Sequence, residues 1–195
     1  MSVSSTSSPS RSASGPVVWF TERVLAGAGA WRFPLLATAV VAAGAAGGQW
    51  PGAADAALRL GLAYLLVVCL RLLDDLVDRA SDRLRHPERS LVRAASTGPH
   101  VAVLCAGLAS ALVTLHWIAP ARAAGLVALL IALGSWYVIP RQRPWVHALA
   151  LLAKYPALAV LLGTEGAQTL PRVAAMTLLY GALVLHERPT DPDLR

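Results

Sequence analysis

Residues 56–73 read AALRLGLAYLLVVCLRLL, an apolar stretch close to the length that crosses a lipid bilayer as a helix. A bilayer core about 30 Å thick needs about 20 helical residues. Only two charged residues, Arg59 and Arg71, interrupt the stretch. The whole chain is similar in character, because 56% of its 195 residues are hydrophobic and 14% are charged, whereas soluble domains carry about 25% charged residues. The sequence therefore predicts a single membrane domain.

Five further apolar stretches predict an all-α, polytopic bundle of about six transmembrane helices. Proline and glycine lie between them and mark the expected helix boundaries. The segment Val17–Trp31, ahead of the first stretch, is expected to form an interfacial helix. The six predicted spans are Phe33–Gly48, Ala56–Leu73, Val101–Ala119, Ala123–Ile139, Trp145–Gly163 and Val173–His186.

Polar segments flank this predicted domain. Residues 1–16 read MSVSSTSSPSRSASGP, a serine-rich composition without an apolar core, which is typical of a disordered tail and not of a secretory signal. Residues 17–188 are predicted to form the membrane helical domain. Residues 189–195 are expected to be a polar C-terminal tail.

The basic residues predict the orientation of the bundle. The net charge of +6 comes mostly from arginines between apolar runs, which favours helix orientation in a bilayer over nucleic-acid binding. If both termini are cytoplasmic, twelve Lys and Arg residues lie inside and three outside. This bias favours an integral protein of a plasma membrane (the inner membrane in bacteria) in contact with membrane lipid. The three predicted outside residues are Arg59, Arg122 and Arg172.

Four aspartates follow the second span, in the sequence RLLDDLVDRASDRLRHPERSLVR of residues 71–93. If the helix continues past the membrane surface, the spacings of Asp74, Asp75, Asp78 and Asp82 place the carboxylates on one face. Clustered carboxylates suit Mg²⁺, which bridges protein oxygens to substrate phosphates, while neighbouring arginines bind the remaining phosphate oxygens. A solvated helix with Asp–Arg ion pairs would have a similar sequence, so both interpretations stay open.

The segment DDLVDRASD, residues 74–82, resembles the first aspartate-rich motif of the UbiA superfamily of intramembrane prenyltransferases. Asp75, Asp78 and Asp82 match the three aspartates of that motif, and Asp74 stands where asparagine is commonest. The sequence after it includes Pro87-Glu88-Arg89-Ser90, where the family has a Pro-x-Arg-Pro turn. Residues 137–144, YVIPRQRP, are similar to the basic loop after the fourth helix of the family.

This resemblance implies a UbiA-like helical bundle and an enzyme that transfers an alkyl group other than methyl. The family moves an isoprenoid chain from a prenyl diphosphate to a small or lipid acceptor and depends on Mg²⁺. Asp75, Asp78 and Asp82 would be the catalytic metal ligands, and Asp74 would assist them. The residues expected to bind the diphosphate are Arg71, Arg89, Arg141, Arg143 and Lys154.

The C-terminal part departs from the family, which has nine helices and a second acidic motif after the sixth. Glu187 and Asp191 are spaced as two metal ligands one helical turn apart, but Pro189 and Pro192 disfavour a regular helix there. A polar tail is the alternative interpretation of these residues. A further membrane subunit could supply the remaining helices.

Lys154 lies within the fifth predicted span, in LLAKYPALAV. A lysine at membrane depth is costly and requires a polar partner or a cavity, so Lys154 is predicted to contact a phosphate or a carboxylate. Two other functions stay open. One is a non-catalytic membrane protein of the same fold that acts as an assembly partner or binds lipid diphosphates, and the other is a small transporter.

Overall fold

The computed structural model describes residues 15–27, 29–139, 144–166 and 168–187, and within these ranges the secondary structure is helical, without strands. Five helical segments are long and apolar enough to cross a membrane, and a sixth is added if the bent N-terminal pair counts as one span. The predicted all-α bundle of about six spans is confirmed for this part of the chain. The spans are α3 (Ala53–Val77), α6 (Gly98–Ile118), α7 (Pro120–Val138), α8 (Pro144–Leu152) with α9 (Lys154–Leu162), and α10 (Thr169–Glu187).

The N-terminal pair corrects one prediction, because Val17–Trp31 is not one interfacial helix. The segment consists of α1 (Pro16–Phe20) and a π-helical turn, η1 (Thr21–Leu25), and the next helix, α2 (Gly29–Ala45), already includes Trp31. The two parts meet at an angle of 75°. Gly27 adopts a φ of 55°, which glycine tolerates and which ends the helical path.

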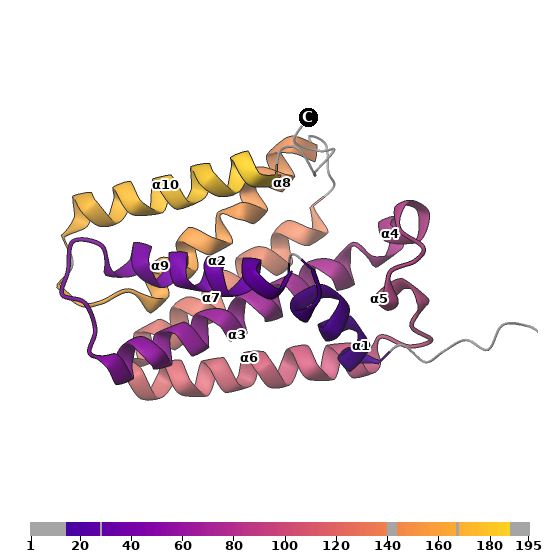
Figure 1. Ribbon diagram of the computed structural model, residues 1–195, viewed down its shortest axis with the longest axis horizontal. Coiled ribbons are helices and arrows are strands. Elements are labelled where there is room, and N and C mark those ends of the chain that lie inside the picture. Colours follow the sequence, from indigo (N-terminus) through magenta and orange to yellow (C-terminus); the bar gives the residue numbers. More distant parts are fainter. Residues whose placement is uncertain (1–14, 28, 140–143, 167, 188–195) are drawn as a thin grey trace, which may run out of the picture.

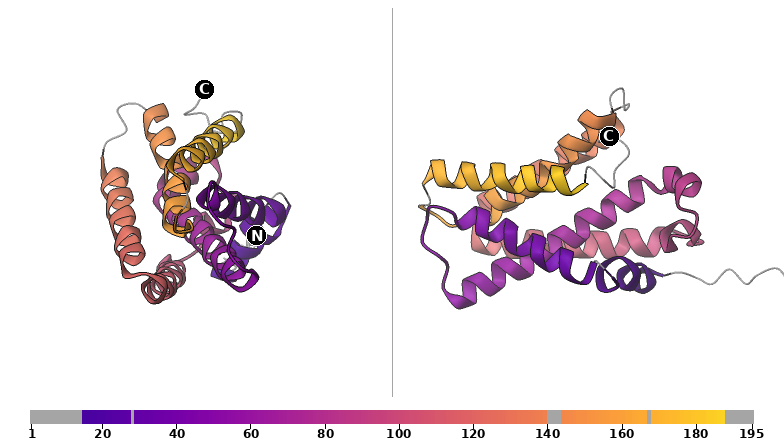
Figure 2. Two further views of the ribbon diagram at one scale, coloured as in Figure 1. Left: turned by 90° about the vertical axis from the view of Figure 1, so that its left-hand side faces the viewer. Right: turned by 45° about the horizontal axis from the view of Figure 1, so that its top comes forward.

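Successive spans run in opposite directions, so the described chain begins and ends at the same end of the bundle (Figure 1). Seen along the bundle, α9 lies among the other helices and contacts α2, α3, α7, α8 and α10 (Figure 2). The core is correspondingly shared by α2, α3, α6, α7 and α9. Its fully buried side chains include Leu66, Leu115, Leu126 and Leu158.

The fifth predicted span is broken into α8 and α9 at Ala153. Pro156 cannot donate the backbone hydrogen bond that would continue the helix, and its ring crowds the preceding turn. The amide of Ala153 instead bonds to the carbonyl of Ala150, and a new helix begins at Lys154. The break places Lys154 in the first turn of α9, against the end of α3.

Two short helices, α4 (Arg79–Arg85) and α5 (Ser90–Arg93), lie beyond the end of α3 (Figure 1). A second apolar cluster connects this region to the N-terminal segment and to α6. Its buried members are Trp19, Val24, Cys69, Leu72, Leu91 and Leu104.

Gly44 marks a close crossing of α2 and α9. A Cβ at this position would lie 2.4 Å from the carbonyl oxygen of Ala159 and 2.9 Å from the Cα of Gly163. We expect Gly44→Ala to lower the free energy of unfolding by about 1–3 kcal/mol, because the two backbones must move apart. Unfolding in mixed detergent micelles with increasing dodecyl sulfate, followed by circular dichroism, measures the change.

Gly181→Ala is the matched control, because no atom lies within 4 Å of the Cβ it would add. It should leave the stability unchanged or raise it slightly, since alanine is the better helix former. Equal stabilities of the two variants would contradict the close packing of α2 on α9.

Candidate functional site

The residues of the aspartate-rich segment lie at the end of the bundle where α3 finishes and α4 begins (Figure 1). Asp74 and Asp75 are in the last turn of α3, Asp78 is the junction residue, and Asp82 is in α4. Carboxylates at the C-terminal end of a helix oppose its dipole, so this arrangement needs compensating cations. The structure provides one for each of Asp74, Asp75 and Asp82.

Asp74 faces α7 and α9. Its carboxylate accepts hydrogen bonds from the Tyr137 hydroxyl at the end of α7 and from the Lys154 ammonium at the start of α9. The Lys154 side chain is 3% exposed and that of Asp74 is 15% exposed. The prediction that Lys154 has a polar partner is confirmed, and the partner is a carboxylate of the same chain.

Asp75 faces the N-terminal segment instead. The Arg23 guanidinium binds both of its carboxylate oxygens, with Nε and Nη2 at 3.0 and 2.8 Å, and the Trp19 indole donates to it at 2.9 Å. Arg71, one turn earlier in α3, lies 3.2 Å away. Asp75 is thus a buried carboxylate that accepts three hydrogen bonds from two side chains and forms a further ion pair with Arg71, a geometry typical of a strong charge-assisted site.

Sequence reasoning missed both N-terminal partners of Asp75. Trp19 and Arg23 are four residues apart and lie on one side of the segment formed by α1 and η1. An arginine and a tryptophan at this spacing present two donors on one side of a helix, a pattern that favours an anionic partner. Nothing in the sequence identifies which carboxylate it is.

The helix is interrupted within the aspartate-rich segment, so the condition for placing all its carboxylates on one face is not met in full. The path of α3 ends at Val77, and Asp78 stands between α3 and α4 although the bonds from the Asp78 amide to Asp74 and from the Asp82 amide to Asp78 persist. Adjacent carboxylates at a helix C-terminus repel one another and oppose the dipole, which favours an interruption there. Asp74 and Asp75, in the last turn of α3, bind cations on different elements.

Asp82 is buried and accepts a hydrogen bond from Arg89, in the turn between α4 and α5. Arg79 holds the same region by donating to the carbonyls of Leu91 and Ala94 at 3.1 and 2.7 Å. These contacts fold residues 79–94 into a compact unit at the end of the bundle. Arg89 therefore lies beside the acidic motif, as the resemblance implies.

Glu187 is brought to the same end by α10. Arg71 interacts electrostatically with Asp74, Asp75 and Glu187, so the last described residue of the chain belongs to the same charged region. Three of the predicted site residues, Arg141, Arg143 and Asp191, lie outside the residues that the structure describes.

The described carboxylates do not form a preassembled metal cage. Within the described ranges, no group of three or more His, Cys, Asp or Glu side chains is arranged to hold a metal ion. The contacts of Asp74 and Asp75 give the reason, because these neighbouring carboxylates point toward different helices and bind different cations. In the charged region, Asp74, Asp75 and Asp82 are therefore each paired with an arginine or lysine side chain.

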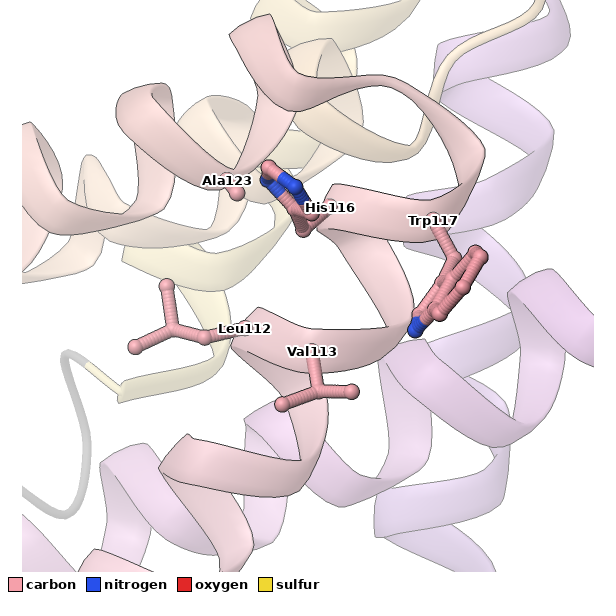
Figure 3. A pocket seen from close by; sticks show the side chains of 5 residues that line it. All are labelled: Leu112, Val113, His116, Trp117 and Ala123. Atoms are coloured by element: carbon pink, nitrogen blue, oxygen red, sulfur yellow. The ribbon is translucent and has the colours of Figure 1, made fainter.

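A surface hollow lies at the opposite end of the bundle, at the turn between α6 and α7 (Figure 3). Its lining is mainly apolar, and it takes no part in the charged region around Asp74 and Asp75. The lining residues are Leu112, Val113, His116, Trp117 and Ala123.

Comparisons with known proteins do not assign the site. No family model matches the chain, and neither a curated protein nor a solved structure matches it. The function of the charged region therefore rests on the chemistry of its own residues and on the short aspartate-rich motif.

Proposed function

We propose that the chain is a UbiA-like prenyltransferase, which moves an isoprenoid chain from a prenyl diphosphate to a small or lipid acceptor. One observation carries the proposal. Three cations expected to bind diphosphate, namely Arg71, Arg89 and Lys154, each contact a carboxylate expected to bind the metal. Both kinds of group are thus gathered at one end of an apolar helical bundle.

The chemistry of these oxygen donors fits Mg²⁺. A magnesium ion held together with substrate phosphates needs only one or two protein carboxylates, so a preassembled cage of three is not required. Asp78 is three residues from Asp75 and four from Asp82 along the chain, and we propose these three as ligands, with Asp74 assisting. Glu187 is a further candidate because it belongs to the same charged region. When bound, Mg²⁺ would neutralise negative charge on the diphosphate leaving group.

Substrate binding would replace the ion pairs between these carboxylates and cations. The carboxylates would turn from their cations to the metal, and Arg71, Arg89 and Lys154 would turn to the phosphate oxygens. Arginine is suited to this because its guanidinium binds phosphate through two parallel hydrogen bonds. The apolar side chains below the site, including Leu66 and Leu158, would exclude water from the reacting allylic carbon.

A binding experiment tests this proposal. Purified protein should bind radiolabelled farnesyl or geranylgeranyl diphosphate when Mg²⁺ is present, and chelation should abolish binding. We expect Asp78→Ala combined with Asp82→Ala to weaken binding by about tenfold or more, because two of the carboxylates proposed to hold the metal are lost. Equilibrium filtration measures the dissociation constants.

Glu88→Ala is the matched control for the double variant. Glu88 lies in the same turn, but its side chain is 71% exposed and contacts only His86 among the ion pairs of the described residues. It should bind the diphosphate as the wild type does. Absence of binding by the wild type, or undiminished binding by the double variant, would refute the prenyltransferase proposal.

The contacts also favour a second candidate, a non-catalytic membrane protein that assembles with a partner or binds lipid diphosphates. The pairs Asp74–Lys154 and Asp75–Arg23 join α3 to α9 and to η1, so they could serve packing alone. Co-purification of a stable membrane subunit, without prenyl transfer by the isolated chain, would favour this function. Robust transfer by the isolated chain would eliminate it.

A further inference from the structure

Three arginines from three helices meet at the end of the bundle opposite the aspartates. Arg59 comes from α3, Arg122 from α7 and Arg172 from α10, and we call them the arginine cluster. All three contact the four consecutive residues 162–165, where α9 ends and the chain turns toward α10. They are also the three basic residues predicted to lie on the outer side of the membrane.

Two of the three arginines, Arg59 and Arg172, bond to backbone carbonyls at the C-terminal end of α9. Buried Arg59 donates through Nη1 to the carbonyls of Leu162 and Gly163 at 2.6 and 2.8 Å, and through Nε to Asp55 at 2.8 Å. Arg172 donates through Nη2 to the carbonyl of Thr164. These bonds satisfy carbonyls that a helix C-terminus leaves unpaired.

Arg122 is not needed to pair the carbonyls at the C-terminal end of α9. Its Nη2 lies 3.9 Å from Oε1 of Glu165, whose side chain is 91% exposed, whereas the Arg122 side chain is only 15% exposed. Arg122 interacts electrostatically with both Arg59 and Arg172, and these interactions are repulsive. Among the described residues, the carboxylates paired with these three guanidinium groups are those of Asp55 and Glu165.

Two buried polar atoms in the same place lack a partner. Neither Nε of Arg172 nor Oγ1 of Thr164 has a hydrogen-bond partner in the part of the chain that the structure describes. Thr164 is only 9% exposed. Buried donors without partners are costly, and an oxyanion placed among them would satisfy them and relieve the repulsion between the arginines.

We propose that the arginine cluster binds a single phosphate group. Arg122 and Arg172 lie in the first turns of α7 and α10, and the ends of membrane-spanning helices meet the phospholipid headgroups. Ala123, beside Arg122, lines the apolar hollow at the α6–α7 turn, which suits an acyl chain (Figure 3). Inorganic phosphate presents the same oxyanion and is the other possible source.

Native mass spectrometry of the purified protein tests the proposal. With phosphatidylglycerol and phosphatidylcholine added in equal amounts, we expect the wild type to retain one phosphatidylglycerol with a preference of about tenfold. Arg122→Gln should lose most of this preference. Arg32→Gln is the matched control, because Arg32 is exposed in α2 and stacks on Trp31 outside the cluster, and it should bind as the wild type does.

A separate titration with inorganic phosphate in lipid-free detergent tells whether the bound phosphate group belongs to a lipid headgroup or to a soluble anion. Thermal stabilisation by phosphate that depends on Arg122, without a lipid preference, would support the site with a soluble anion as its ligand. Glu165→Gln removes a competing carboxylate and should tighten binding, a readout that does not depend on the folding of Arg122→Gln. The site would be refuted if neither phosphatidylglycerol nor phosphate bound in a manner that depends on these two residues.

Discussion

Lys154→Met is expected to lower the free energy of unfolding by about 3–5 kcal/mol, because it would leave the Asp74 carboxylate buried without its cation. The Lys154 side chain is 3% exposed and the Asp74 side chain 15%, so water cannot replace the lost partner fully. Tyr137 would still donate to Asp74, but a neutral hydroxyl compensates a buried charge only in part. Unfolding by dodecyl sulfate in mixed micelles, followed by circular dichroism, measures the difference.

Asp74→Asn provides the control, alone and combined with Lys154→Met. The combined variant has neither charge, so its loss of stability should be clearly smaller than the sum of the two single losses. Additive losses would show that Asp74 and Lys154 do not stabilise each other. Normal stability of Lys154→Met would contradict the buried pair itself.

Arg23→Gln is expected to have the next largest effect, a loss of about 2–3 kcal/mol. It removes two charge-assisted hydrogen bonds to the buried Asp75 carboxylate and separates the N-terminal segment from α3. The Arg71 ion pair and the Trp19 hydrogen bond to Asp75 remain, which limits the loss. The same unfolding measurement applies, and protease cleavage near residue 27 should become faster, because the N-terminal segment is then less firmly held.

Arg93→Gln is the matched control for Arg23→Gln. Arg93 lies 3.5 Å from Glu22 of the same N-terminal segment, but its side chain is 57% exposed, so its pair contributes about 0–1 kcal/mol. A loss for Arg23→Gln no larger than that for Arg93→Gln would mean that Asp75 does not anchor the N-terminal segment.

The apolar stretches predicted most of the bundle because a membrane helix depends mainly on length and hydropathy. The structure extends the second span at both ends, to Ala53 and Val77, and shows that Pro156 divides the fifth. The N-terminal helix was mispredicted because Gly27 adopts a left-handed backbone conformation that hydropathy does not register. Lys154 was correctly expected to have a polar partner, since no lone ammonium is stable at that depth.

The sequence indicated the aspartates and Lys154 of the charged region, but not their pairing or the partners Trp19, Arg23 and Tyr137. Asp74 and Asp75 are adjacent in α3, and a step of one residue along a helix rotates the side chain by about 100°. That rotation directs one carboxylate to α9 and the other to η1. The partners Trp19 and Arg23 precede Asp75 by 56 and 52 residues, a separation over which local sequence patterns carry no information about contact.

One cation partner precedes its aspartate in the sequence and the other follows it, so the two ion pairs form at different times during synthesis. Arg23 is synthesised before Asp75, so that carboxylate can be neutralised as soon as α3 leaves the ribosome. Lys154 follows Asp74 by 80 residues, so the five helices α4 to α8 are translated before Asp74 gains its cation. A nascent chain stalled before α9 should therefore keep the end of α3 at the headgroup layer. Once Lys154 is translated and pairs with Asp74, the end of α3 can move to its final position in the bundle.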